Sequence, residues 1–223
     1  MRDDVNKRYR GKSPLVWAKE FENEDVVKAL EEKGAVEYFL SEEEARKLGD
    51  KLIFASFYGN TEDVENFIEA GVDVDFQNDG GRTALINGCV RNSLGVIEKL
   101  VDAGANLDIQ DNNGHTALIA AAYSRDVDIV AKLVDAGANL DIRDNRGYTA
   151  LMYAIENPNM EILTKLIDAG ADLNLKDNDG VNVLGYVQDN SQRKAILEAI
   201  KLRKSKNKEL GFVDKLKGIF TRE

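Results

Sequence analysis

The side chains that could perform chemistry are few in this 223-residue chain, which holds one histidine, His115, and one cysteine, Cys89. A lone histidine and a lone cysteine exclude an internal disulfide and a metal site built from several such ligands. No Ser, Cys or Asp motif surrounds His115 to make it a general base with an oriented proton acceptor. We therefore expect His115 to be an ordinary exposed polar residue at a turn, and Cys89 to be a small buried apolar one.

The carboxylates and glycines also lack the spacing of a catalytic or ligand-binding motif. Asp108, Asp111, Asp141 and Asp144 could suggest calcium, but the twelve-residue loop that ends in Glu is missing from the sequence. No Gly-Lys-Ser/Thr signature follows a predicted strand, which excludes a phosphate-binding loop. The sequence predicts a non-enzymatic protein with no cofactor, no metal site and no catalytic residue.

The net charge of −10 is distributed unevenly along the chain. Residues 1–12 carry +3 and residues 178–223 carry +4, whereas residues 13–78 carry −11 and residues 79–177 carry −6. Binding to nucleic acid is excluded, because it needs clustered Lys and Arg. The acidic segment instead favours a partner protein with a basic surface, whose approach it would steer.

Hydropathy predicts neither a signal peptide nor a membrane span. Residues 1–12 contain no apolar stretch of signal-peptide length, and no apolar run approaches the length that crosses a bilayer. We therefore expect the protein to be cytoplasmic.

A period of 33 residues organises the middle of the chain. Gly81-Arg-Thr-Ala-Leu85 recurs at Gly114 and Gly147, with a worn copy at Gly180, and Asp102-Ala-Gly-Ala105 recurs with the same period. Self-similarity at this interval is typical of stacked repeats, in which each unit buries its apolar face against its neighbours.

Within one unit, local signals predict two helices and a turn. Thr116 is placed to cap a first helix through Ala122, and short polar residues at 124–126 are placed to cap a second. In the next unit we expect Asn157-Pro158 to begin the second helix, with Pro at the first helical position. Gly137 should end a helix in a left-handed conformation, and Asp144-Asn-Arg-Gly147 should form a tight turn.

These motifs resemble the ankyrin repeat. The residues that carry the resemblance are Asp111–Gly114, Thr116-Ala-Leu118, Ala121-Ala122 and Gly137-Ala138. The resemblance covers about residues 13–203. It implies an all-α solenoid of about six helix-turn-helix units with short hairpin turns. The usual Pro and His of the family are replaced here, the first by Ala84, Ala117 and Ala150, and the second by Ile86, Ile119 and Met152. We expect the apolar replacements to take the place of the family's Thr–His hydrogen bonds.

The predicted organisation has a basic arm at 1–12, a repeat domain at 13–203 and a basic tail at 204–223. The units are expected at about 13–49, 50–78, 79–111, 112–144, 145–177 and 178–203, with a helical start at 41–48 in place of a tight turn. Leu184, Ile196 and Ile200 should be core residues of the last unit. In the tail, residues 209–220 predict an amphipathic helix that either caps the array or binds a partner groove or a membrane surface.

The resemblance implies that partners contact the turn tips and the first-helix face, which line a concave groove. We expect Tyr58, Tyr123 and Tyr148 to be exposed anchors, although Tyr58 and Tyr123 could instead cover adjacent helices and Phe57 could belong to the core. The full predicted set is Phe57, Tyr58, Asp79, Arg82, Val90, Arg91, Asn112, His115, Tyr123, Ser124, Asn145, Arg146, Tyr148, Glu156 and Asn157.

The function that these features favour is protein binding by a chain that is monomeric when free. One role that the resemblance allows is a small inhibitor, such as an immunity protein that blocks a toxin. The alternatives are a membrane-peripheral adaptor that uses the basic tail, and a secreted effector that acts on host proteins.

Overall fold

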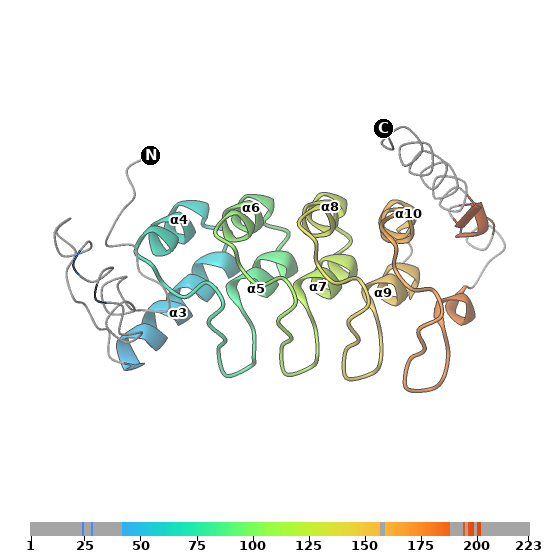
Figure 1. Cartoon of the computed structure of the whole chain (residues 1–223), viewed down its shortest axis with the longest axis horizontal. Coiled ribbons are helices and arrows are strands. Elements are labelled where there is room, and N and C mark those ends of the chain that lie inside the picture. The colour runs from blue at the N-terminus through green and yellow to red at the C-terminus, as the bar shows by residue number, and fades with distance from the viewer. Residues whose placement is uncertain are drawn as a thin grey trace, which may run out of the picture.

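The computed structural model describes residues 24, 28, 42–156, 159–187, 194, 196–198 and 200–201. Within these residues the chain forms an all-α repeat solenoid of two parallel rows of helices (Figure 1). The first-helix row contains α3 (Glu42–Phe57), α5 (Ala84–Val90), α7 (Ala117–Ser124) and α9 (Ala150–Glu156). The second-helix row contains α4 (Thr61–Glu69), α6 (Leu94–Asp102), α8 (Val127–Asp135) and α10 (Met160–Ala169). A short 3-10 helix, η1 (Val183–Tyr186), follows.

Side-chain caps begin most helices of the repeat, although Ser93 makes no such bond at the start of α6. Thr83 and Thr116 each accept a hydrogen bond from the backbone N–H three residues later, at 3.2 Å. The predicted cap at Thr116 is thereby confirmed, and Asp126 caps α8 in the same way. The predicted start of α10 at Asn157-Pro158 is wrong, because Asn159 accepts bonds from two backbone N–H groups and the helix begins at Met160. The capping side chain lies two residues further along than we expected.

The core lies between the two rows and continues from unit to unit. Leu100, Leu133 and Leu166 repeat every 33 residues and are fully buried. Each first helix packs on the next, from α3 to α5, α7 and α9. The chain therefore has one elongated core, which no single helix pair could form alone.

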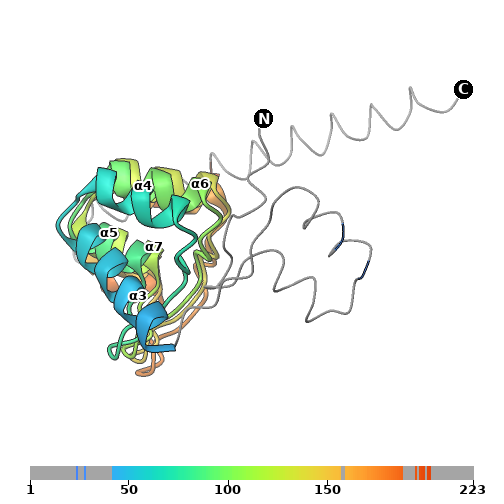
Figure 2. The same ribbon diagram turned by 90° about the vertical axis from the view of Figure 1, so that its left-hand side faces the viewer.

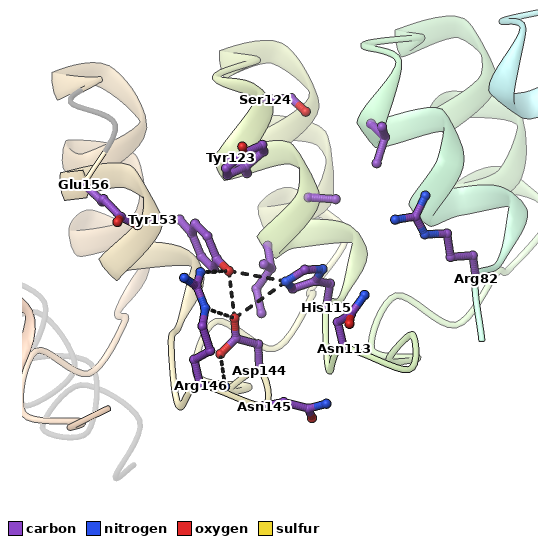
Figure 3. A pocket seen from close by; sticks show the side chains of 13 residues that line it. Arg82, Asn113, His115, Tyr123, Ser124, Asp144, Asn145, Arg146, Tyr153 and Glu156 are labelled. Atoms are coloured by element: carbon purple, nitrogen blue, oxygen red, sulfur yellow. Dashed lines mark hydrogen bonds and ion pairs between the residues drawn. The ribbon is translucent and has the colours of Figure 1, made fainter. Parts of the chain in front are cut away.

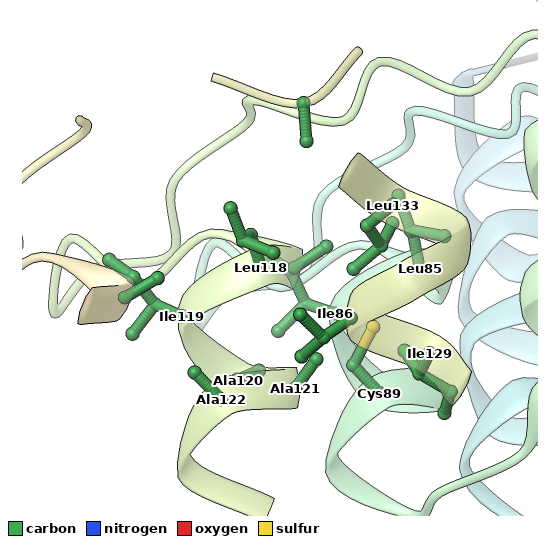
Figure 4. Packing of buried hydrophobic residues seen from close by; sticks show 14 of the residues in the cluster. Leu85, Ile86, Cys89, Leu118, Ile119, Ala120, Ala121, Ala122, Ile129 and Leu133 are labelled. Carbon is green, nitrogen blue, oxygen red and sulfur yellow. The ribbon is translucent and has the colours of Figure 1, made fainter. Parts of the chain in front are cut away.

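Residues that depart from the usual ankyrin pattern belong to this core. Ile86, Ile119 and Met152 are all fully buried, as expected of apolar side chains in place of a polar one. Cys89 is buried too and lies close to Ala121 and Ile129 (Figure 4). Burial raises the pKa of the Cys89 thiol far above its usual value, so this cysteine stays protonated, as its predicted packing role requires.

Hydrogen bonds between turns hold successive units in register. Asn112 Nδ2 donates to the carbonyl oxygen of Asp79 at 2.9 Å, and Asn145 repeats this bond with Asn112 at 2.9 Å. Asn178 then bonds in the same way to Asn145, at 2.8 Å. The predicted tight turn is confirmed, because Gly147 N–H donates to Asp144 O at 2.8 Å. Seen from the end of the array, the turns overlie one another beside the two rows (Figure 2).

The ends of the array differ from its middle. The helix start expected at 41–48 is continuous with the first helix of the next unit, so α3 has 16 residues and runs across the boundary predicted at 49/50. In the last unit Ile196 is fully buried, but Leu184 is 41% exposed and not the core residue that we predicted. The arm at 1–12 and the tail at 204–223 lie outside the described residues.

Among the described residues no helix is both long enough and apolar enough to cross a bilayer.

A pair of glycines tests the importance of turn stacking. Gly114 and Gly137 both have positive φ, at 81° and 91°. A Cβ on Gly114 would lie 2.8 Å from the backbone of the next turn, at Asn145 N and Asp144 Cα, whereas a Cβ on Gly137 would meet no atom within 4 Å. Gly137→Ala should therefore lower the free energy of unfolding by only about 1 kcal/mol, the strain of a left-handed alanine. Gly114→Ala should cost at least about 2 kcal/mol more, because backbone must also move. Urea unfolding of the full chain measures both, and equal losses would show that the turns do not pack as described.

Candidate functional site

A pocket of about 770 Å³ opens beside α7, between the turns and the first-helix row (Figure 3). We call it the α7 pocket. Eight of the fifteen residues predicted to contact a partner line it, which are Arg82, Val90, His115, Tyr123, Ser124, Asn145, Arg146 and Glu156. The structure therefore brings together about half of the predicted surface at one place.

The α7 pocket is also lined by five residues that were not predicted from the sequence, which are Asn113, Ile119, Ala120, Asp144 and Tyr153. The repeat pattern itself indicated one of them, Tyr153. The position occupied by Ala120 in α7 is occupied by Tyr153 in α9, 33 residues later. A large aromatic that replaces a methyl group at an equivalent position marks a place where neighbouring units differ in shape.

Tyr153 is the centre of a closed hydrogen-bond network on the pocket wall. Its hydroxyl donates to Asp144 Oδ2 at 2.7 Å and accepts from Arg146 at 2.5 Å. His115 Nε2 lies 3.3 Å from the same hydroxyl oxygen. The hydroxyl has one proton, which it donates in the hydrogen bond to Asp144. A hydrogen bond with His115 therefore requires the proton of the imidazole to be on Nε2. The network thus fixes the orientation of three side chains that face the pocket.

The same Asp–Tyr pair recurs in the last unit but is missing from the unit of α7. Asp144 and Asp177 each accept a hydrogen bond from the tyrosine nine residues later, Tyr153 and Tyr186. The residue nine positions after Asp111 is Ala120, which has no hydroxyl to offer. The absence of a tyrosine at position 120 leaves the α7 pocket open above Asp111.

His115 occupies part of this space and lies between two buried carboxylates. Its Nδ1 is 3.6 Å from Asp111 Oδ2, and its Nε2 is 3.6 Å from Asp144 Oδ2. Arg82 Nε approaches Asp111 Oδ2 at 3.5 Å from the other side. His115 is half-buried among charged neighbours, which corrects the prediction of an ordinary exposed residue. Sequence spacing did not show this, because Asp144 belongs to the next unit.

The protonation of the network follows from its contacts. Burial, assisted by the hydrogen bond to Asp144, raises the pKa of Tyr153 to about 12. The hydrogen bond to Tyr153 raises the pKa of Arg146 above its already high usual value. The phenol is therefore neutral and the guanidinium charged at physiological pH.

Aromatic side chains extend the wall of the pocket along the array. The ring of Tyr123 is 63% exposed and meets Tyr153 edge-on, with centroids 5.8 Å apart. Tyr148 lies 5.6 Å from Tyr153 and 5.3 Å from Tyr186. Tyr148 is half-buried between them, so the prediction that it is an exposed anchor is wrong. Its place in the repeat suggested exposure, but Tyr153 of the same unit and Tyr186 of the next unit cover it.

The remaining predicted residues lie elsewhere on the array. Tyr58 is 63% exposed and packs against Phe54, whereas Phe57 is half-buried beneath the guanidinium of Arg91, 4.7 Å from its ring centroid. Asp79 pairs with Arg46 at 2.6 Å. The amide of Asn112 is used in the bond between turns described above, and Asn157 lies outside the described residues. These residues extend the predicted surface without entering the α7 pocket.

The chemistry available to the pocket is recognition by charge, hydrogen bonding and aromatic contact. In the described part of the chain, no group of three or more His, Cys, Asp or Glu side chains could hold a metal ion. The pocket presents an exposed tyrosine ring and two arginines beside a wall in which Tyr153 is hydrogen-bonded to Asp144 and Arg146. Such a preorganised wall keeps its shape when a ligand binds.

Comparison with known proteins gives one result. A family model described as ankyrin repeats (3 copies) matches residues 52–144, 88–177 and 128–207. Together these matches cover more than half of the chain. No curated protein matches it.

Removal of one hydroxyl group tests the Tyr153 network. Tyr153→Phe should lower the free energy of unfolding by about 1–3 kcal/mol, because it leaves the buried Asp144 Oδ2 without its hydrogen-bond donor. Tyr123→Phe is the matched control, since its ring is exposed and its hydroxyl makes no hydrogen bond within the described residues. Chemical denaturation followed by circular dichroism measures both variants. Similar stability of the two variants would show that the hydrogen bonds of Tyr153 do not stabilise the fold.

Alkaline pH tests the same group in another way. The pKa of Tyr153 rises on folding from 10 to about 12, so folding favours the protonated phenol. Its contribution to stability is complete below pH 10 and falls as pH rises to 12, because the unfolded chain ionises first. The stability advantage of the parent chain over Tyr153→Phe should therefore shrink across this range. An advantage that stayed constant from pH 9 to pH 12 would contradict the assignment.

Proposed function

The chain belongs to the ankyrin repeat family, and from this premise we propose that it is a non-catalytic cytoplasmic protein that binds a partner protein through the α7 pocket and the turn tips. Ankyrin repeats generally mediate protein–protein interaction and are typically non-enzymatic. One observation carries the proposal for this chain: the exposed ring of Tyr123 stands over a preorganised pocket of about 770 Å³.

The size and composition of the pocket support this proposal. Its volume is within the range of about 300–1,000 Å³ typical of ligand pockets. Tyrosine and arginine, which dominate the energetics of protein interfaces, both line it as Tyr123, Arg82 and Arg146. A side chain of the partner that entered the pocket would be desolvated next to them, and this is how interface hot spots gain affinity.

A second contact region adjoins the α7 pocket at the end of α3. Phe54 and Tyr58 are each 63% exposed, with ring centroids 4.4 Å apart. Arg91 lies over the neighbouring Phe57. We propose that a partner long enough to span two units uses this aromatic platform in addition to the pocket.

Within this function the role that we favour is inhibition, as in an immunity protein that blocks a toxin. Its support is the preorganised wall around Tyr153, because preformed sites lose little conformational entropy when they bind and can reach high affinity. The adaptor alternative rests on residues 204–223, which lie outside the described residues. The effector alternative has no support among the described residues.

The basic partner surface expected from the net charge would meet a different part of the molecule. Within residues 42–78 many of the acidic side chains lie on α4, where they are Glu62, Asp63, Glu65 and Glu69. Electrostatic steering of a basic surface would thus act from the second-helix row. We propose that this contribution, if the partner provides such a surface, affects the association rate more than the stability of the complex.

Truncation of the exposed ring tests the binding surface. Tyr123→Ala should weaken capture of the natural partner from the cells that make the protein by about 30-fold, which corresponds to about 2 kcal/mol for a hot-spot residue. The thermal unfolding curve should change little, since the ring is mainly in solvent. Met160→Ala is the control, because Met160 is an exposed apolar residue of the second-helix row. Equal capture by all three proteins would move the binding surface away from the α7 pocket.

A further inference from the structure

The two rows of helices differ sharply in charge. α5 and α7 contain no charged residue, and α9 contains only Glu156. The second-helix row is acidic by contrast, with carboxylates in the first turns of α4, α8 and α10 at Glu62, Asp63, Asp128 and Glu161. From α5 to α10 the acidic helix residues therefore lie mainly on the second-helix row, whereas α3 of the first-helix row carries charges of both signs.

Arginines, in contrast, gather at the α7 pocket. Arg82 and Arg146 lie on opposite sides of it, with His115 between them (Figure 3). Their side chains are 40% and 59% exposed. Arg91 adds a third cation at the end of α5, next to the pocket residue Val90. The exposed charged groups that line the pocket are therefore two arginines and one carboxylate, Glu156, beside the aromatic ring of Tyr123.

The buried carboxylates offset part of the arginine charge but leave the guanidinium donors accessible. The side chains of Asp111 and Asp144 are only 1% exposed, so a partner could not reach them. Each accepts two backbone hydrogen bonds through Oδ1, at 2.8–2.9 Å. Both arginines approach these carboxylates through Nε at 3.5 and 3.7 Å, which is beyond good hydrogen-bond distance. Within the described residues the guanidinium of Arg82 makes no hydrogen bond, so its donors remain available to a ligand.

Taking the proposed function as its basis, we propose that the segment of the partner that docks in the α7 pocket is acidic. A Glu or Asp side chain of this segment would lie between Arg82 and Arg146, and an adjacent aromatic or aliphatic side chain would pack on Tyr123. Guanidinium groups pair well with carboxylates because their planar donors match the two oxygens. The net charge of the chain favours a basic partner, but the accessible charged hydrogen-bond donors in the pocket are those of the two arginines, which favour an acidic group at this place.

The neighbouring carboxylates favour a carboxylate over a phosphate as the ligand. Asp111 and Asp144 lie within 4 Å of the two arginines, and Glu156 stands on the pocket wall. This nearby negative charge weakens the field that a doubly charged phosphate would need. A singly charged carboxylate is repelled less and still receives the arginine hydrogen bonds.

Selection from a random peptide library displayed on phage, with the full chain as bait, tests this inference. The expected result is enrichment of peptides that contain Glu or Asp next to an aromatic residue. For a synthetic peptide of the enriched sequence, Arg82→Gln with Arg146→Gln should weaken binding by at least tenfold. The control Lys132→Gln with Lys165→Gln removes the same charge from the second-helix row and should change binding little.

Each outcome of the selection has a distinct meaning. Because Arg146 also supports the Tyr153 network, Arg82→Gln alone is measured too, and circular dichroism confirms that each variant is folded. Enrichment of basic or neutral peptides whose binding falls in Tyr123→Ala would overturn the acidic ligand and leave the proposed function intact. If no peptide is enriched, or if the enriched peptides bind equally to the Tyr123 and arginine variants, both proposals fail.

Discussion

Apolar surface shared between neighbouring units is the interaction on which the rest of the structure depends. The helices between α5 and α9 have only seven to nine residues, too few to persist alone in water. They persist because Leu100, Leu133 and Leu166 are buried between rows that continue on either side. A unit therefore has a fixed shape only in the presence of its neighbours, and any site on the first-helix row is a property of two or three units together.

The α7 pocket shows this dependence directly. Its wall combines His115 from one turn with Asp144 and Arg146 from the next turn and Tyr153 from α9. The bonds between Asn112 and Asp79 and between Asn145 and Asn112 set the distance between those turns. Small residues that allow tight turns and close helices thus place a histidine of one unit within reach of a carboxylate of the next.

Periodicity predicted the fold well because every strong local signal agreed with it. The caps at Thr116 and Asp126 and the turn at Asp144–Gly147 follow from side chains that act within three or four residues. One error is local, because the cap of α10 is Asn159 and not Asn157. The errors at the site concern contacts that the period does not show. Tyr148 was predicted to be exposed, but Tyr153 of its own unit and Tyr186 of the next unit cover it, and the surroundings of His115 depend on a residue 29 positions away. A single sequence with one histidine offers no repeated pattern from which such a contact could be recognised.

Ala120 gives the pocket a simple origin. In a repeat, the same backbone position is available in every unit, and here one unit carries a methyl group where the next carries a phenol. The equivalent position in the preceding unit is Asn87, so the side chain at this position varies in size along the array, and the opening lies where it is smallest. Exchange of a single side chain between adjacent units could relocate a recognition site by one unit without new backbone geometry. The position of the binding site along the array would then be set by side-chain size.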